Sequence, residues 1–362
     1  MLGKPLAFAH GGVHRRHVKR PHVDLMKTLK NIPYTVSMEL VRGIVQSIAR
    51  KGYAPEPFLL QAGIAPQLLE QPGARVSSDQ YIALMWRVIS ALNDEALGLF
   101  SRPLKRGSLE LIARVASAEQ TVEGALERMC EVHNLLQDDV EVSLLVSAGE
   151  AAICVRSLSN QPAANFLYEY LLRILWRIAS WLMGGGLKVR QFDFAFAQPD
   201  YVRDYGEAFP APMRFGQAVA AFWFEAGLLR RVCRRDESAL RSFVASWPAA
   251  AVIPARAGNG VATLVHAHLQ QSRPLWVGLE ATAAALHMSA PTLQRKLSAA
   301  GTSFQAIKDG LRRDIAISRL GTSTVSFATL AADLGFADAA AFQRAFKGWT
   351  GSPPGLYRVR AV

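Results

Sequence analysis

The 362-residue sequence lacks any long uninterrupted apolar run. A membrane-spanning helix needs about 18 or more consecutive apolar residues, and the nearest stretch, 166–183, is interrupted by Glu169, Arg173 and Arg177. The apolar segment at residues 6–9 is too short for a signal peptide, and the positive charge follows it. We therefore expect a cytoplasmic protein without a membrane span.

Cysteine is also scarce. Cys130, Cys154 and Cys233 lie far apart and form no CxxC pair, which favours buried free thiols in a reducing compartment. A redox-sensing thiol is the alternative. The four histidines within residues 1–32 do not have metal-ligand spacing, so we expect no metal site.

Motifs of known catalytic chemistry are missing as well. The sequence contains no GxSxG, no HExxH and no glycine-rich phosphate loop. Asp138, Asp139 and Asp193 stand at expected strand starts, where acids are more often solvated turn residues. His266 and His268 are two residues apart on an expected helix and point to different faces. We expect no catalytic residues, no cofactor and no enzymatic activity.

The net charge of +12 is distributed unevenly. Residues 1–30 hold seven Lys/Arg and one acid, residues 261–362 hold eleven and five, and the remainder is neutral with 23 of each. A local basic excess is typical of a DNA-binding region. Residues 1–32 show little apolar periodicity and are predicted to be a basic, disordered tail; the alternatives are a phosphate-contacting arm, or sequence upstream of a start at Met26 or Met38.

The chain divides into segments of different composition. Residues 33–247 mix helical and strand patterns, with a β-hairpin at 140–155 and further strands at 187–197 and 213–224, which predicts an α+β effector-sensing and dimerisation domain. Residues 248–260 are rich in Ala, Pro and Gly, as in a linker. The aromatic strand at 192–196 either lines a ligand pocket or, more commonly, packs in the core. Residues 261–360 are predicted to be all-α.

Residues 279–298 have the pattern of a helix-turn-helix motif. Apolar residues on one face mark the first helix: Leu279, Ala283 and Leu286. His287-Met288 makes the turn, and Ser289 is placed as the N-cap of the second helix.

Residues 326–347 repeat this pattern. The apolar residues of the first helix are Phe327, Leu330, Ala331 and Leu334. Gly335 supplies the turn, because glycine has no penalty at positive φ, and Asp338 caps the second helix. A helix at 304–320 joins the two copies. Two tandem motifs predict a DNA-binding domain.

The tandem segment resembles the AraC/XylS family of transcription regulators. The residues that carry the resemblance are Ser289, Thr292-Leu293-Gln294-Arg295, Leu297, Gly301-Thr302-Ser303-Phe304, Leu330-Ala331, Leu334-Gly335-Phe336, Phe342, Arg344-Ala345-Phe346, Gly351, Pro354 and Tyr357-Arg358. More loosely, the middle of the chain is similar to the effector domain of the branch that includes ornithine-utilisation regulators. The carriers there are Gly63-Ile64, residues 118–127, Met213-Arg214-Phe215-Gly216 and the stretch to Phe224-Glu225.

The resemblance implies specific contacts with double-stranded DNA. Both recognition helices are expected to enter successive major grooves, about 34 Å apart. The base-contacting candidates are Thr292, Gln294, Arg295, Gln343 and Arg344. Candidates for phosphate contacts, for which a solvated charged face is as good an interpretation, are Lys296, Lys308, Arg312, Arg313 and Lys347. Leu293, Leu297, Phe342 and Phe346 are expected to be buried and to hold the two helices.

Two departures from the family pattern make the motif asymmetric. Pro291 and Ala339-Ala340-Ala341 occupy positions that are often polar. Alanine can meet a thymine methyl group but cannot form hydrogen bonds with bases. We expect specificity to lie mainly in the first motif.

The resemblance further implies a small-molecule effector, RNA polymerase as a partner, and a homodimer formed through the 166–183 helix, whose apolar face could equally be core. A regulator that binds DNA without a ligand, and uses its middle domain only to dimerise, is the alternative function. An enzyme with a DNA-binding appendage is disfavoured by the missing catalytic set.

Overall fold

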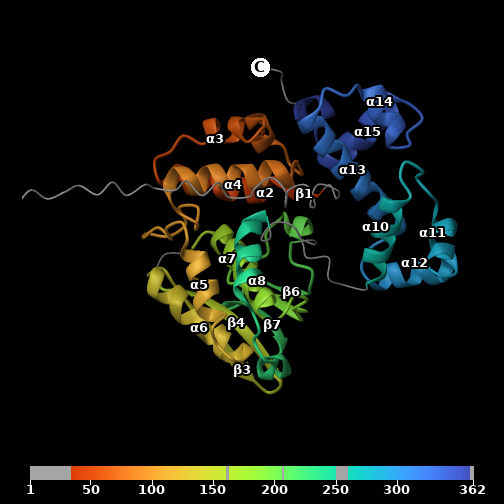
Figure 1. Ribbon diagram of the computed structural model, residues 1–362. Coiled ribbons are helices and arrows are strands. Elements are labelled where there is room, and N and C mark those ends of the chain that lie inside the picture. The colour runs from red at the N-terminus through yellow and green to blue at the C-terminus, as the bar shows by residue number, and fades with distance from the viewer. Residues whose placement is uncertain (1–33, 160–162, 206–207, 250–259, 359–362) are drawn as a thin grey trace, which may run out of the picture.

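The computed structural model describes residues 34–159, 163–205, 208–249 and 260–358. They form an α+β part, which holds the first three ranges, and a helical part, which holds the last (Figure 1). The predicted fold class of both parts is confirmed. Among the described residues, no helix is long and apolar enough to cross a bilayer.

The α+β part begins with a helical layer beside a short two-stranded ribbon. The ribbon pairs β1 (Thr35–Ser37) with β2 (Arg75–Ser77) in antiparallel register. The layer contains α2 (Met38–Arg50), α3 (Glu56–Gln61), the 3₁₀ turn η1 (Pro66–Glu70) and α4 (Ser78–Leu92). A capping box fixes the start of α4, because the Ser77 hydroxyl accepts from the Gln80 amide and the Gln80 side chain accepts from the Ser77 amide.

A five-stranded sheet forms the other half of this part. Its members are β3 (Val140–Ser147), β4 (Glu150–Ser157), β5 (Gln191–Asp193), β6 (Met213–Arg214) and β7 (Ala220–Glu225). The order is β3-β4-β7-β5-β6, antiparallel except for the β5–β6 pair. The predicted hairpin is confirmed, with Ala148 and Gly149 in its turn at positive φ.

One strand prediction is wrong in extent. The regular strand in the 187–197 segment is β5 alone, whereas the 213–224 segment contains β7, as predicted, preceded by the short β6. Beyond β5, Phe194 and Phe196 form backbone hydrogen bonds with residues 214–217, and their rings pack in an aromatic cluster with Phe209 and Phe215. Core packing therefore explains the aromatic segment.

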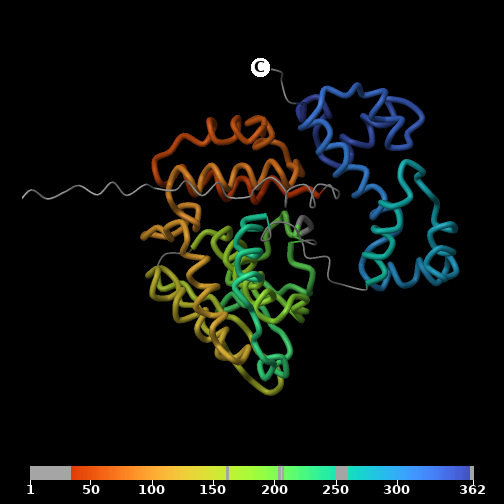
Figure 2. Tube along the Cα trace, viewed as in Figure 1, coloured from red at the N-terminus to blue at the C-terminus, as the bar shows by residue number. Residues whose placement is uncertain are grey.

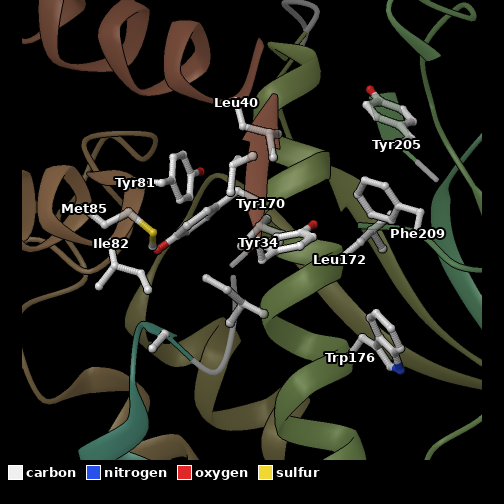
Figure 3. Packing of buried hydrophobic residues seen from close by; sticks show 14 of the residues in the cluster. Tyr34, Leu40, Tyr81, Ile82, Met85, Tyr170, Leu172, Trp176, Tyr205 and Phe209 are labelled. Carbon is white, nitrogen blue, oxygen red and sulfur yellow. The ribbon is translucent and has the colours of Figure 1, made fainter. Parts of the chain in front are cut away.

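Helix α7 (Asn165–Leu182) is the centre of the α+β part. All of its residues except Asn165 and Trp181 are buried, including Glu169, Arg173 and Arg177. Figure 3 shows Tyr170 of α7 among side chains of the helical layer, with Leu172 and Trp176 further along the helix. The suggestion that this helix forms a dimer interface is wrong, because the protomer's own core covers it.

Around α7 lie three more helices. They are α5 (Ser108–Ala116), α6 (Val122–Leu136) and α8 (Glu237–Ser246). The 3₁₀ turn η2 (Val202–Tyr205) lies between β5 and β6, and η3 (Ala226–Arg230) lies between β7 and α8. α6 packs on β3, and α5 packs on both α6 and α8.

Asp193 of β5 is not a solvated turn residue as predicted. Its carboxylate is buried and accepts hydrogen bonds from Arg214 (2.8 Å, twice), Trp223 (2.6 Å) and Gln191 (2.7 Å). These bonds lower the pKa of Asp193 against the opposing effect of burial. The acid therefore joins β5, β6 and β7.

Gly43 of α2 has no room for a side chain. A Cβ there would lie 2.2 Å from Cγ of Phe166 on α7. Gly43→Ala is expected to reduce the free energy of unfolding by about 1–3 kcal/mol through overpacking. Gly310 is the matched control, because a Cβ at this helical position meets no atom within 4 Å. Gly310→Ala is expected to increase the free energy of unfolding by up to about 1 kcal/mol. Denaturant titration of both variants measures this, and equal shifts would contradict the packing of α2 on α7.

His133 of α6 makes stability depend on pH. Burial lowers its pKa to about 4, whereas an unfolded histidine titrates near 6.5. Between about pH 6.5 and pH 4 the proton binds mainly to the unfolded chain. The free energy of unfolding therefore falls by up to about 3 kcal/mol as the pH falls from about 6.5 to 4. His133→Gln is expected to flatten the stability profile between pH 7 and 4.5, and the exposed-site control His287→Asn is not. Parallel profiles for wild type and His133→Gln would rule this out.

The helical part consists of six α-helices and a final turn within residues 260–358. The helices are α10 (Val261–Gln271), α11 (Leu279–Ala285), α12 (Ala290–Ala299), α13 (Phe304–Thr322), α14 (Phe327–Asp333) and α15 (Ala339–Thr350), followed by η4 (Pro354–Tyr357). Helix α13 has α11 and α12 at one end and α14 and α15 at the other (Figure 1).

The two parts touch through the β1–β2 ribbon. The first described residues run beside the C-terminal helices (Figure 2). Arg75 donates to the Thr35 hydroxyl (2.7 Å), which in turn donates to Asp314 of α13 (2.6 Å). The Arg75 amide donates to the hydroxyl of Tyr357 (3.3 Å). All four residues are buried, so the ribbon and α13 form a closed interface.

Candidate nucleic-acid interface

The first helix-turn-helix motif is built from α11 and α12. The Ser289 hydroxyl caps α12 by accepting from the Thr292 amide (3.3 Å), as predicted. His287 lies in the turn at φ 56°. Leu293 and Leu297 are fully buried, so they hold α12 in place and leave its opposite face to solvent.

The second motif, α14 and α15, follows the same plan. Asp338 caps α15 by accepting from the Ala341 amide (2.6 Å), as predicted. Gly335 turns the chain at φ 72°. Phe342 and Phe346 are fully buried, and their rings contact Phe336 and Tyr357 respectively.

An aromatic clamp around Arg312 connects the two motifs. Its guanidinium carbon lies 4.9 Å from the ring centroids of both Trp276 and Phe336, and burial lowers the pKa of Arg312. The Trp276 indole donates to the Asp333 carbonyl (2.9 Å). Because Trp276 precedes α11 while Phe336 lies between α14 and α15, the clamp fixes one motif relative to the other.

The length of α13 suits two successive major grooves. Its 19 residues span about 29 Å, close to one turn of B-DNA at about 34 Å. The expected base-contacting residues Gln294 and Arg295 of α12, and Gln343 and Arg344 of α15, are all exposed. Thr292 is half-buried, and its hydroxyl accepts from Ser289 (2.9 Å).

The five candidates for phosphate contacts fall into two groups. Lys296 and Lys347 are exposed. Lys308 donates to the carbonyls of Trp276 (2.9 Å) and Val277 (3.1 Å), and partial burial lowers its pKa. Arg312 lies in the aromatic clamp, and Arg313 donates to Asp314 (3.0 Å). Three of the five side chains are therefore engaged within the protein, and the phosphate role of the set stays a prediction.

Trp276 and the β1–β2 ribbon were missed by the sequence reasoning. Trp276 stands between two expected helices, where no apolar periodicity indicates its packing partners. Three-residue strands are too short to show alternation. Helix α8 was also missed, although Asp236, whose carboxylate caps it, is a usable signal.

Comparison with known proteins connects both parts to one family. Residues 52–232, half of the chain, match the arabinose-binding N-terminal domain of AraC transcription regulators, and residues 282–360 match a helix-turn-helix domain. The chain belongs to the AraC family of transcription regulators. This confirms the predicted resemblance, and the helix pair at each end of α13 is the DNA-binding element of an AraC-family protein.

Curated relatives of this AraC-family chain extend over nearly its whole length. It is 26% identical to the ornithine utilization regulator of Pseudomonas aeruginosa, over 90% of this chain and 98% of the relative. It is 25% identical to the regulator VirS of Mycobacterium tuberculosis, over 88% and 94%. Among solved structures, the regulator CdpR of Pseudomonas aeruginosa is 21% identical over 69% of this chain and 81% of its own, with a TM-score of 0.28.

Proposed function

We propose that this regulator binds a two-part DNA site and that a small molecule bound in its α+β part controls this binding. The proposal that the protein binds a two-part DNA site rests on the geometry of α12 and α15. Both helices expose polar, base-competent side chains, and both are fixed on α13 by buried apolar residues and the Arg312 clamp. Arg and Gln form bidentate pairs with guanine and adenine.

Effector control is supported by the contact between the two parts. A ligand changes DNA affinity if it favours one arrangement of the parts over another. Hydrogen bonds attach the α+β part to α13 and η4. They run from Arg75 through Thr35 to Asp314, and from the Arg75 amide to the Tyr357 hydroxyl. A shift of the ribbon would therefore act on the helix that sets the spacing of the two recognition helices.

The base contacts in this proposal are Thr292, Gln294, Arg295, Gln343 and Arg344, with Lys296 and Lys347 as the exposed phosphate contacts. A second copy of the chain and RNA polymerase are the protein partners expected from the family, and the cytoplasm is the expected location. No dimer surface is assigned, because α7 is interior.

A ligand screen of the full chain tests effector control. Thermal-shift measurements against amino acids, fatty acids and aromatic metabolites are followed by DNA titration with each hit at fixed salt. A stabilising compound that changes DNA affinity supports the proposal. Stabilisation by none, with constant DNA affinity, favours the ligand-independent regulator. Turnover of a hit would favour an enzyme.

A further inference from the structure

A cavity of about 250 Å³ lies in the α+β part, between α4, α5, α7 and α8. Figure 1 shows α5, α7 and α8 side by side, and α5 packs on both of the others. Small-molecule sites usually occupy roughly 300–1,000 Å³, so this cavity is slightly smaller than the usual range. It suits a compound of the size of an amino acid.

One wall of the cavity is apolar. The residues that form it are Trp86, Leu109, Ile178, Phe243, Val244 and Trp247. Leu109, Ile178 and Trp247 are buried, and the Phe243 ring stacks on Trp181 with 4.7 Å between centroids. Aromatic and aliphatic side chains held in this way provide a preformed surface for an apolar group.

The remaining wall carries charges of both signs. The Glu95 carboxylate is fixed at the start of α5, since one oxygen accepts from the Gly107 amide and the other from the Leu109 amide, both at 2.9 Å. Each of these oxygens keeps a further lone pair for a ligand donor. Glu110, whose Oε1 accepts a hydrogen bond from Arg114 (3.2 Å), adds a second carboxylate to the lining.

Arg106 supplies the positive charge. Its side chain is exposed and lines the cavity. It interacts electrostatically with Glu95, but no hydrogen bond or ion pair joins its guanidinium to any residue within the described ranges. A guanidinium with unused donors is suited to a bidentate contact with a carboxylate.

We propose that this cavity is the effector site and that it binds a free amino acid with an apolar side chain. The ammonium group lies against Glu95 and Glu110, the carboxylate pairs with Arg106, and the side chain packs on the apolar wall. An amine without a carboxylate leaves the donors of Arg106 unused, and a carboxylic acid without an amine offers no cation to Glu95 and Glu110. The zwitterion is the chemistry that satisfies both signs.

Helix α8 forms part of the cavity wall and has few other buried contacts. Leu240 is its only buried residue, and its exposed ion pair between Glu237 and Arg114 contributes little. Phe243, Val244 and Trp247 contact a ligand from the end of α8, which is the last helix described before α10. An amino acid in the cavity therefore adds contacts to a weakly held helix.

This inference rests on the proposed effector control, and titration of the full chain tests the two separately. The twenty common L-amino acids are screened by thermal shift and calorimetry. At least one with an apolar side chain is expected to bind once per chain. Its decarboxylated amine and its deaminated acid are expected to bind about tenfold or more weaker, because each loses a charge-assisted contact.

Variants locate the site. Val244→Trp fills the cavity and is expected to abolish binding, whereas Ala245→Trp on the exposed side of α8 is not. Arg106→Gln is expected to weaken binding about tenfold or more, and Lys105→Gln to leave it unchanged. Glu95 is left intact because it caps α5.

The results of these titrations distinguish ligand binding in the cavity from control of DNA binding. The inference is overturned if no amino acid binds, if the matched amine or acid binds as well as the amino acid, or if Val244→Trp binds like wild type. An amino acid that binds in the cavity without changing DNA affinity upholds the site and overturns effector control by this ligand. A different metabolite that binds elsewhere and changes DNA affinity upholds effector control and overturns the cavity as the effector site.

Discussion

Arg295→Ala is expected to weaken specific DNA binding roughly 5- to 150-fold, because a bidentate arginine–guanine pair contributes about 1–3 kcal/mol. Arg295 is exposed on α12, whose helix is fixed by Leu293 and Leu297. The loss should be confined to the cognate site, so that affinity for unrelated DNA falls much less. Fluorescence anisotropy titration of both DNAs at one salt concentration measures the difference.

Arg344→Ala is the matched comparison in the second motif. Ala339, Ala340 and Ala341 leave α15 with fewer hydrogen-bonding groups, so the second half-site should be recognised less strictly and the loss should be smaller. Equal losses for the two arginine variants on the same operator would contradict the asymmetry.

Lys296→Ala should weaken binding to all sequences alike and reduce the salt dependence of binding.

Gly351→Ala is expected to disrupt the contact between the two parts of the molecule. Gly351 ends α15 at φ 71°, and a Cβ there would lie 2.5 Å from the backbone carbonyl oxygen of Pro72. The positive φ alone costs about 1–3 kcal/mol for a residue with a side chain, and the clash adds about 1–3 kcal/mol. Unlike a flexible side chain, the Pro72 carbonyl cannot move without shifting the ribbon.

Gly301→Ala isolates the backbone contribution. Gly301 has the same φ of 71°, but a Cβ there meets no atom within 4 Å. Hydrogen exchange at the Arg75 amide, which donates to Tyr357, reports the interface directly. We expect it to accelerate in Gly351→Ala and to stay at the wild-type rate in Gly301→Ala. Unchanged exchange in Gly351→Ala would mean that the ribbon does not depend on this contact.

The helix-turn-helix motifs could be predicted closely because their signals are local. Ser289 and Asp338 cap helices within three residues of themselves, and Gly335 marks a turn that needs positive φ. The exposed Gln294, Arg295, Gln343 and Arg344 follow from the same periodicity that buries Leu293 and Phe342. Their contacts with DNA remain predictions.

The interface and the cavity could not be predicted because both arise from residues far apart in the chain. Thr35 and Asp314 are 279 positions apart and carry no shared pattern. The aromatic alternation at 187–197 predicted too long a strand because the aromatic packing of Phe194 and Phe196 continues beyond the three residues of β5. Glu95 and Arg106 lie in an irregular segment, so only the fold places them opposite the apolar residues of α8.

Selection of DNA from a random-sequence pool by the full chain, followed by footprinting of the enriched sequence, tests the central claim most directly. We expect an enriched motif with two parts about one helical turn apart, protected on one face of the duplex, with the α12 half more strictly defined than the α15 half. Arg295→Ala should relax the strict half alone. A pool that yields no enriched motif, or a single site too short for two recognition helices, would contradict it.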